Sequence, residues 1–146
     1  MKKIILRTVG YGGYPWGMKK KAIAEKLIEE TGDFLLIDVR SKPRGRVAKE
    51  DFDYEKQYYH IQFFGNPEYT KFFEKGYAVI KQLIQEGHDK FLLMCAEKDP
   101  NKCHRSEIKE MLKIRLISDG FAVGDEGDVS GIELKGVQMT FTSPVG

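Results

Sequence analysis

Residues 91–106 read FLLMCAEKDPNKCHRS, and the rest of the chain is organised around this stretch. Its apolar start predicts a buried strand that ends at Cys95, and its charged end predicts an amphipathic helix that opens near Cys103. A strand end followed by a helix N-terminus with an arginine can bring backbone N–H groups, the helix dipole and a guanidinium beside one sulfur. The stretch therefore predicts an anion site next to a thiol.

The composition is that of a single globular domain. The 146 residues are 41% hydrophobic and 12% aromatic, which is enough apolar material for one substantial core. A net charge of +2 does not by itself require a nucleic-acid or anionic membrane partner. Because Arg7 interrupts the short apolar run near the start, we expect no signal peptide, no membrane-spanning segment and no membrane partner. Two cysteines without an export signal favour a reduced, cytoplasmic protein over a disulfide framework.

Strand and helix patterns alternate along the chain and predict the fold class. Asn66 is the expected N-cap of the second helix and Pro67 its first helical residue. The order of elements predicts a single three-layer α/β domain with a mostly parallel sheet. Apolar runs of strand length occupy residues 3–9, 33–39, 58–64 and 91–95, and helical patterns occupy residues 19–30, 66–86 and 103–113.

The C-terminal part is expected to extend the same domain. We assign residues 1–118 to the α/β domain, with residues 115–118 as a short last strand. Glycines and acidic residues dominate residues 119–131 and predict a loop, and residues 132–142 predict a hairpin or two short strands. Residues 119–146 are therefore expected to be a loop and β-hairpin extension.

Three strand ends carry polar or glycine-rich sequence, and their convergence is the main functional signal. Ligands of open α/β sheets bind outside the carboxyl ends of the strands, so neighbouring strands would place these loops around one cleft. We expect this cleft to bind a small anionic or nucleotide-like ligand, with Arg40, Arg46 and Arg105 as its cations. The three ends are Gly10-Tyr11-Gly12, Asp38-Val39-Arg40, and the segment from Cys95 through Glu97 to Arg105.

Cys95 is the candidate nucleophile, because nearby cations stabilise a thiolate at a strand end. The alternative is that Cys95 only packs, since free cysteine is among the most buried residue types. His104 is the candidate acid or base and Cys103 a second thiol at the ligand site, and the alternative is that both are simply residues of the first helical turn. A redox pair of Cys95 and Cys103 is geometrically conceivable, although the spacing is unlike C-x-x-C. We expect no metal, because the spacing is unlike zinc knuckles and adjacent helical residues point about 100° apart.

A basic stripe supports an alternative function. Arg40, Lys42, Arg44 and Arg46 recur at every second position, which places four cations on one side of an extended segment. Such a stripe is the first mark of a nucleic-acid-binding module. His60 lies within an apolar run, and we expect it to be a hydrogen-bonded core residue.

Four segments resemble an uncharacterised family called domain of unknown function 488: TVGYGG (8–13), LLIDVRSKPRGR (35–46), NPEYTKFF (66–73) and LLMCAEKDPNKCHRSEI (92–108). The resemblance covers residues 4–117 and implies a small cytosolic α/β domain without an established general activity. A looser likeness connects the DVR and Cys-loop-Arg arrangement to rhodanese-like proteins and cysteine-dependent phosphatases, whose anion loops are shorter. The positions that match the family are Gly10, Tyr11, Gly12, Asp38, Arg40, Pro43, Arg46, Cys95, Glu97, Pro100, Cys103, His104 and Arg105.

The sequence does not decide whether the protein is an enzyme, and it names no cofactor. The first hypothesis is an anion-binding protein with a cysteine-centred activity, and the second is a nucleic-acid-binding module. The third is a non-catalytic structural or interaction domain in which the cysteine motif only maintains the fold.

Overall fold

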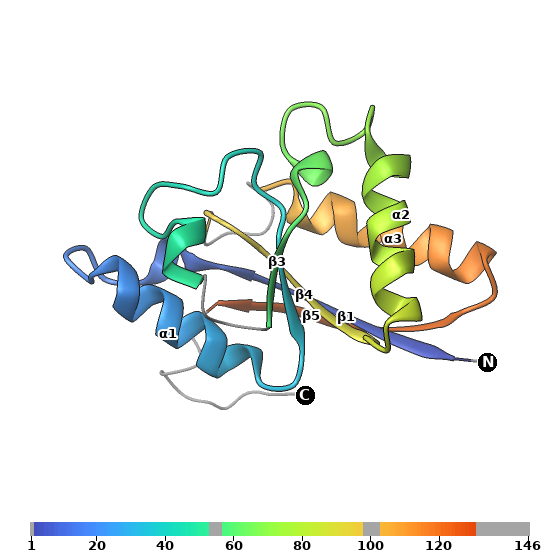
Figure 1. Ribbon diagram of the computed structural model, residues 1–146, viewed down its shortest axis with the longest axis horizontal. Helices are drawn as coiled ribbons and strands as arrows, with labels where there is room; N and C mark the ends of the chain where they lie inside the picture. Colours follow the sequence, from blue (N-terminus) through green and yellow to red (C-terminus); the bar gives the residue numbers. More distant parts are fainter. Residues whose placement is uncertain (1, 53–56, 98–102, 131–146) are drawn as a thin grey trace.

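A parallel sheet forms the centre of this computed structural model, which describes residues 2–52, 57–97 and 103–130 (Figure 1). Five strands are present in the described part of the chain, in the order β3-β2-β4-β1-β5. Every pairing is parallel, so the predicted α/β class with a parallel sheet is confirmed. The strands are β1 (Lys3–Gly10), β2 (Leu35–Asp38), β3 (Tyr58–His60), β4 (Lys90–Cys95) and β5 (Ala122–Ser130).

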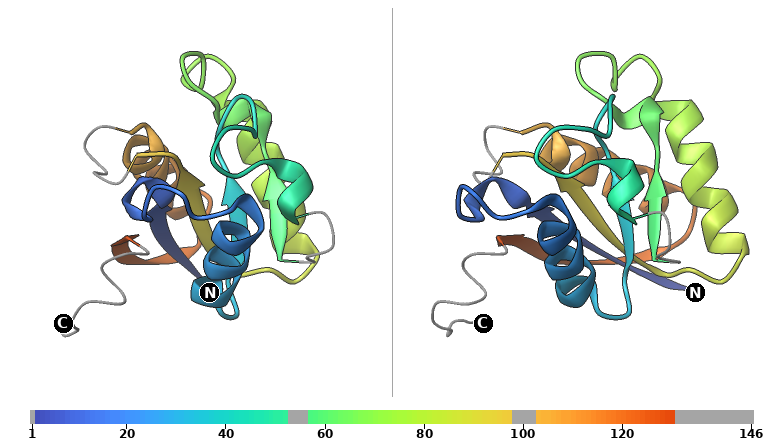
Figure 2. Two further views of the ribbon diagram at one scale, coloured as in Figure 1. Left: turned by 90° about the vertical axis from the view of Figure 1, so that its left-hand side faces the viewer. Right: turned by 60° about the vertical axis from the view of Figure 1, so that its left-hand side comes forward.

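Helices cover both faces of the sheet (Figure 2). Helix α1 (Lys20–Thr31) packs on one face, and α2 (Phe73–Gln85) and α3 (Arg105–Ser118) pack on the other. Strand β2, which lies between β3 and β4, is buried along its whole length, and this explains its uninterrupted apolar sequence. The three layers are those predicted from the sequence. None of the described helices is long and apolar enough to cross a membrane.

Helix α2 begins at Phe73, so the prediction of a helix from Pro67 is wrong. Residues 67–72 form turns instead. The Tyr69 ring lies 5.2 Å from the His104 ring, and its hydroxyl donates a hydrogen bond to Glu107 of α3. Residues 67–72 therefore pack against the start of α3 and do not continue the axis of α2.

The third predicted strand is shorter than expected. Strand β3 ends at His60, and Gln62–Phe64 form a short 3₁₀ helix that contributes the buried Phe64 to the core. His60 is half-buried, and its Nε2 atom lies 2.6 Å from the carbonyl oxygen of Arg40. The hydrogen bond predicted for His60 is thus confirmed, whereas the prediction that His60 belongs to the core is wrong, because its side chain is only half-buried.

The last described part of the fold differs most from the prediction. Residues 115–118, expected as a strand, complete helix α3, and residues 122–130, expected as a loop, form β5 beside β1. The acidic residues that suggested a loop bind cations of α3: Asp125 pairs with Lys109 and Lys113. Acidic residues thus stand in β5 where apolar residues usually alternate along a strand, so the sequence did not predict a strand there. The predicted hairpin over residues 132–142 lies outside the described residues.

Candidate functional site

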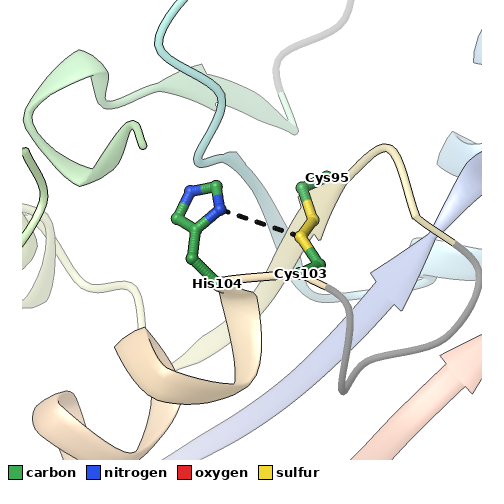
Figure 3. A group of neighbouring side chains, drawn as sticks. All are labelled: Cys95, Cys103 and His104. Atoms are coloured by element: carbon green, nitrogen blue, oxygen red, sulfur yellow. Dashed lines mark hydrogen bonds between the residues drawn. A yellow bond between two sulfur atoms is a disulfide. The ribbon is translucent and has the colours of Figure 1, made fainter. Parts of the chain in front are cut away.

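Cys95, Cys103 and His104 meet at the carboxyl end of β4 (Figure 3). Cys95 is the last residue of β4, and Cys103 and His104 lie just before α3. A disulfide joins the two sulfurs, so the cysteines are not the free thiols that the composition favoured. The ligand atoms of the three side chains lie within 4.8 Å of one another. We call these three residues the Cys-His cluster.

The start of α3 explains how Cys103 and His104 come together. Adjacent residues point about 100° apart only where both belong to a regular helix. Helix α3 begins only at Arg105, so the preceding turn is free to direct both side chains inward. His104 Nδ1 lies 3.8 Å from Cys103 Sγ. The prediction that the Cys103 and His104 side chains point apart is therefore wrong.

A backbone carbonyl fixes the orientation of the His104 ring. Its Nε2 atom lies 2.9 Å from the carbonyl oxygen of Val39, which follows β2. A carbonyl oxygen only accepts hydrogen bonds, so Nε2 of the neutral ring carries the hydrogen. Nδ1 then presents its lone pair toward Cys103. Nothing in the sequence marked Val39 for this role, because it acts through its backbone.

Arg105 connects the cluster to β5, the strand at one edge of the sheet. Its side chain is 0% exposed, and its Nε and Nη2 atoms donate to the carboxylate of Asp128 at 2.8 and 3.2 Å. Nη1 donates to the Glu97 carbonyl at 2.6 Å and lies 3.4 Å from Cys95 Sγ. The guanidinium thus places a positive charge beside the sulfur while protein groups surround it. Sequence reasoning missed Asp128 because it lies in the segment expected to be a loop.

Arg40 is also buried and fully engaged by the protein. Its Nε and Nη2 atoms donate to the two carboxylate oxygens of Asp38 at 2.9 and 2.7 Å. Nη1 donates to the Val47 carbonyl at 2.6 Å and to the Tyr11 hydroxyl at 3.0 Å. Burial opposes the charge, but Asp38 and Tyr11 outweigh it and raise the pKa of Arg40 above its usual value. Asp38, Arg40 and Tyr11 therefore hold the loop after β2 in place.

Gly10 allows a close approach, as predicted for the first strand end, but the approaching group belongs to the chain itself. A Cβ atom at Gly10 would collide with the Glu97 carbonyl and meet the Arg105 guanidinium. Gly12 is exposed, and Arg46 donates to the Pro15 carbonyl at 2.6 Å. Neither Gly12 nor Arg46 lines the pocket described next.

An open pocket of about 280 Å³ adjoins the Cys-His cluster. Five of the predicted site residues line it, namely Arg40, Cys95, Glu97, Cys103 and His104. Ser41 and Asn66 also line it and were not predicted as site residues, although both lie in segments that carry the family resemblance. The lining residues are Arg40, Ser41, Asn66, Cys95, Ala96, Glu97, Cys103 and His104.

A comparison with protein families supports the resemblance seen in the sequence. Residues 67–112 match the family described as Domain of unknown function DUF488, and this match supports the suspected family over that segment. The matched segment contains α2, β4, the Cys-His cluster and the first turns of α3. The looser rhodanese likeness is not confirmed. No curated protein and no solved structure matches the chain.

Proposed function

We propose that the protein performs thiol–disulfide exchange with a small anionic thiol or disulfide at the Cys95–Cys103 pair. One observation carries the proposal: the paired sulfurs, a histidine nitrogen with a free lone pair and the mouth of a pocket coincide at the carboxyl end of the sheet. A cleft at this end of a parallel sheet is the usual place for a ligand in such folds.

The two cysteines have different surroundings, and this difference suggests separate roles. Cys95 is 2% exposed and lies beside the Arg105 guanidinium, whereas Cys103 is half-buried and lies beside His104 Nδ1. Cys103 is therefore the sulfur that meets the substrate. Cys95, the nucleophile expected from the sequence, acts inside the protein and attacks Cys103 once a mixed disulfide has formed.

The reduction of a substrate disulfide then balances in two steps. Cys103 gives its proton to His104 Nδ1, and its thiolate attacks one substrate sulfur, so that a mixed disulfide forms and the first thiolate leaves. The Cys95 thiolate attacks Cys103, which closes the protein disulfide and releases the second thiolate. Two electrons pass from the cysteines to the substrate, and the two released thiolates take up the protons of the cysteines.

The reverse reaction uses the charge of Arg105. An incoming thiolate attacks Cys103, and Cys95 leaves as a thiolate beside the guanidinium. A leaving thiolate that is stabilised departs faster. The anionic part of the ligand is assigned to the wall of the pocket, where the Ser41 hydroxyl and the Asn66 amide can donate hydrogen bonds.

A redox titration tests this function. The protein is equilibrated with mixtures of reduced and oxidised glutathione in a buffer with a chelator, and the free thiols are alkylated and counted by mass spectrometry. We expect one reversible two-electron transition per chain. The His104→Gln variant should reach the same equilibrium at least tenfold more slowly, because Cys103 loses its base. Cysteines that stay unpaired at every ratio, or that pair and cannot be reduced without unfolding, would refute the proposal.

Trp16 favours a second candidate function, the binding of single-stranded nucleic acid. Its side chain is 88% exposed, and the Arg46 guanidinium lies 4.8 Å from the ring centre. Lys42 and Arg44 are exposed nearby in sequence, whereas Arg40 is buried and takes no part in a basic stripe. Exposed aromatic rings and cations together suit stacked bases and phosphates.

Fluorescence of this one tryptophan provides the test. Under the second candidate function, a single-stranded oligonucleotide should quench it, and the affinity should fall steeply with added salt. The Arg44→Ala variant should lower the slope of log affinity against log salt by about one. Fluorescence that the oligonucleotide leaves unchanged would exclude this function.

A further inference from the structure

We infer that the reduced Cys-His cluster binds one thiophilic divalent metal ion of the zinc(II) type through Cys95 Sγ, Cys103 Sγ and His104 Nδ1. The inference rests on the proposed function, because two sulfurs that bind the ion cannot at the same time be joined to each other. Reduction then opens the metal site, and oxidation closes it.

The distance between the Cys103 sulfur and the His104 nitrogen suits such an ion. Zinc lies about 2.3 Å from sulfur and about 2.0 Å from nitrogen, so the ligand atoms of a tetrahedral site lie about 3.3–3.8 Å apart. The sulfur of Cys103 and Nδ1 of His104 are already 3.8 Å apart, and all three ligand atoms lie within 4.8 Å of one another.

The backbone spacing of the two cysteines also leaves room for an ion. Their Cα atoms lie 7.2 Å apart. Disulfides usually span about 4.4–6.8 Å between Cα atoms, so this pair stands wider than a direct bond between the sulfurs prefers. An ion between separated sulfurs fits the wider spacing.

His104 carries the hydrogen-bond arrangement that metal-binding histidines use. Such a histidine donates its second ring N–H to a carbonyl or carboxylate, which fixes the ring and leaves the other nitrogen for the metal. In this structure Nε2 donates to the Val39 carbonyl at 2.9 Å. Since Nδ1 faces Cys103, the ring is set for binding before any ion arrives.

The charges of the site are balanced for a dication. Two thiolates neutralise the ion, and the nearby Arg105 already has its counter-charge in Asp128. Arg105 Nη1, at 3.4 Å from Cys95 Sγ, supplies the kind of hydrogen bond that outer groups give to metal-bound sulfur. All three ligands line the pocket, so the fourth position of a tetrahedral ion is open to water or to a ligand there.

Metal binding and disulfide formation exclude each other, and this makes the site a redox-controlled one. A disulfide oxidant takes two electrons from the two metal-bound thiolates. The products are the protein disulfide, the released dication and two thiolates of the oxidant. A bound ion should therefore slow oxidation, and oxidation should release the ion.

Cobalt(II) titration of the reduced, metal-free protein tests the site. We expect one ion per chain, with absorption bands of thiolate-to-cobalt charge transfer and of a tetrahedral ion. The Cys103→Ser variant should lose the charge-transfer intensity of one thiolate, and His104→Gln should weaken binding at least tenfold. The oxidised protein should bind no ion.

His60→Gln is the matched control for His104→Gln. The two histidines have similar contacts, because each Nε2 atom lies beside a backbone carbonyl that follows β2. His60, however, is not part of the Cys-His cluster. His60→Gln should keep the cobalt bands and the affinity. An equal loss in both variants, or a protein that shows no bands, would overturn the inference.

A measurement on the unmutated protein guards against variants that do not fold. Zinc(II) should protect both cysteines of the reduced protein from alkylation, and a chelator should remove this protection. The glutathione titration in chelator tests the proposed function separately. A reversible pair with no protection by zinc overturns the inference alone, and protection by zinc in a protein whose cysteines never pair overturns the proposed function alone.

Discussion

Two buried arginines at two strand ends show how similar contacts serve different purposes. Arg40 and Arg105 each bind both oxygens of an aspartate, but the partner of Arg40 is Asp38, two residues earlier. The partner of Arg105 is Asp128, on a strand at the edge of the sheet. The first pair closes on its own loop. The second joins β5 and α3 and brings a charge to Cys95, so only the second connects the fold to the sulfur chemistry.

The largest expected effect comes from breaking the local pair. Asp38→Ala leaves the Arg40 guanidinium buried without its counter-charge, and we expect a loss of about 3–5 kcal/mol in the free energy of unfolding. Tyr58, whose hydroxyl also donates to Asp38, loses a partner in the same variant. Urea unfolding followed by circular dichroism measures the loss. If the two arginines differ as described, the glutathione equilibrium of the folded fraction should not change.

Asp128→Ala should have a smaller effect on stability and a larger one on the sulfur pair. The Asp128 side chain is 19% exposed, so water compensates part of the lost pairing, and we expect a loss of about 1–3 kcal/mol. Without these two hydrogen bonds the Arg105 guanidinium should lie less firmly beside Cys95, which should change the glutathione ratio at the midpoint by severalfold. An unchanged midpoint would show that Arg105 does not act on the sulfur.

Gly10→Ala tests the contact between the strand ends. The new Cβ meets the Glu97 carbonyl, a backbone atom that cannot rotate away, so residues 95–97 must shift. We expect a loss of about 1–3 kcal/mol in the free energy of unfolding. The exposed Gly12 provides the control, and Gly12→Ala should change stability by no more than about 0.5 kcal/mol. Similar values for both variants would contradict the close contact at Gly10.

The smallest expected effect concerns Asp125 of the edge strand β5 and its dependence on pH. Burial opposes ionisation of Asp125, but the Gly127 N–H, Lys109 and Lys113 outweigh it and lower the pKa of the carboxyl below 3.8. Its stabilising contribution is therefore present above pH 3.8 and is lost as the pH falls through the lowered value. We expect Asp125→Asn to reduce stability by about 0.5–1 kcal/mol at pH 7, since water screens these pairs. The difference from the unmutated protein should shrink in acid unfolding curves as the pH falls below 3.8.

The Asp38–Arg40 pair could be predicted from the sequence, whereas the Arg105–Asp128 pair could not. Asp38 and Arg40 are neighbours along the chain, so their closeness follows from a single strand end. Asp128 was missed because β5 exposes acids to the cations of α3 and offers no apolar alternation to recognise. The closeness of Cys103 and His104 depends on the dihedral angles of a turn, and residue types do not determine those angles. The strand ends were predictable, and the contacts across them were not.

The position of β1 has a consequence for how the protein is synthesised. In the described sheet order β3-β2-β4-β1-β5, strand β1 lies between β4 and β5, which both follow it late in the chain. A ribosome delivers the chain from its N-terminus, so β1 emerges with no partner until residues 90–95 follow. Contacts between such distant segments form slowly. A chain that stalls before β4 therefore exposes an unpaired apolar strand, which favours aggregation.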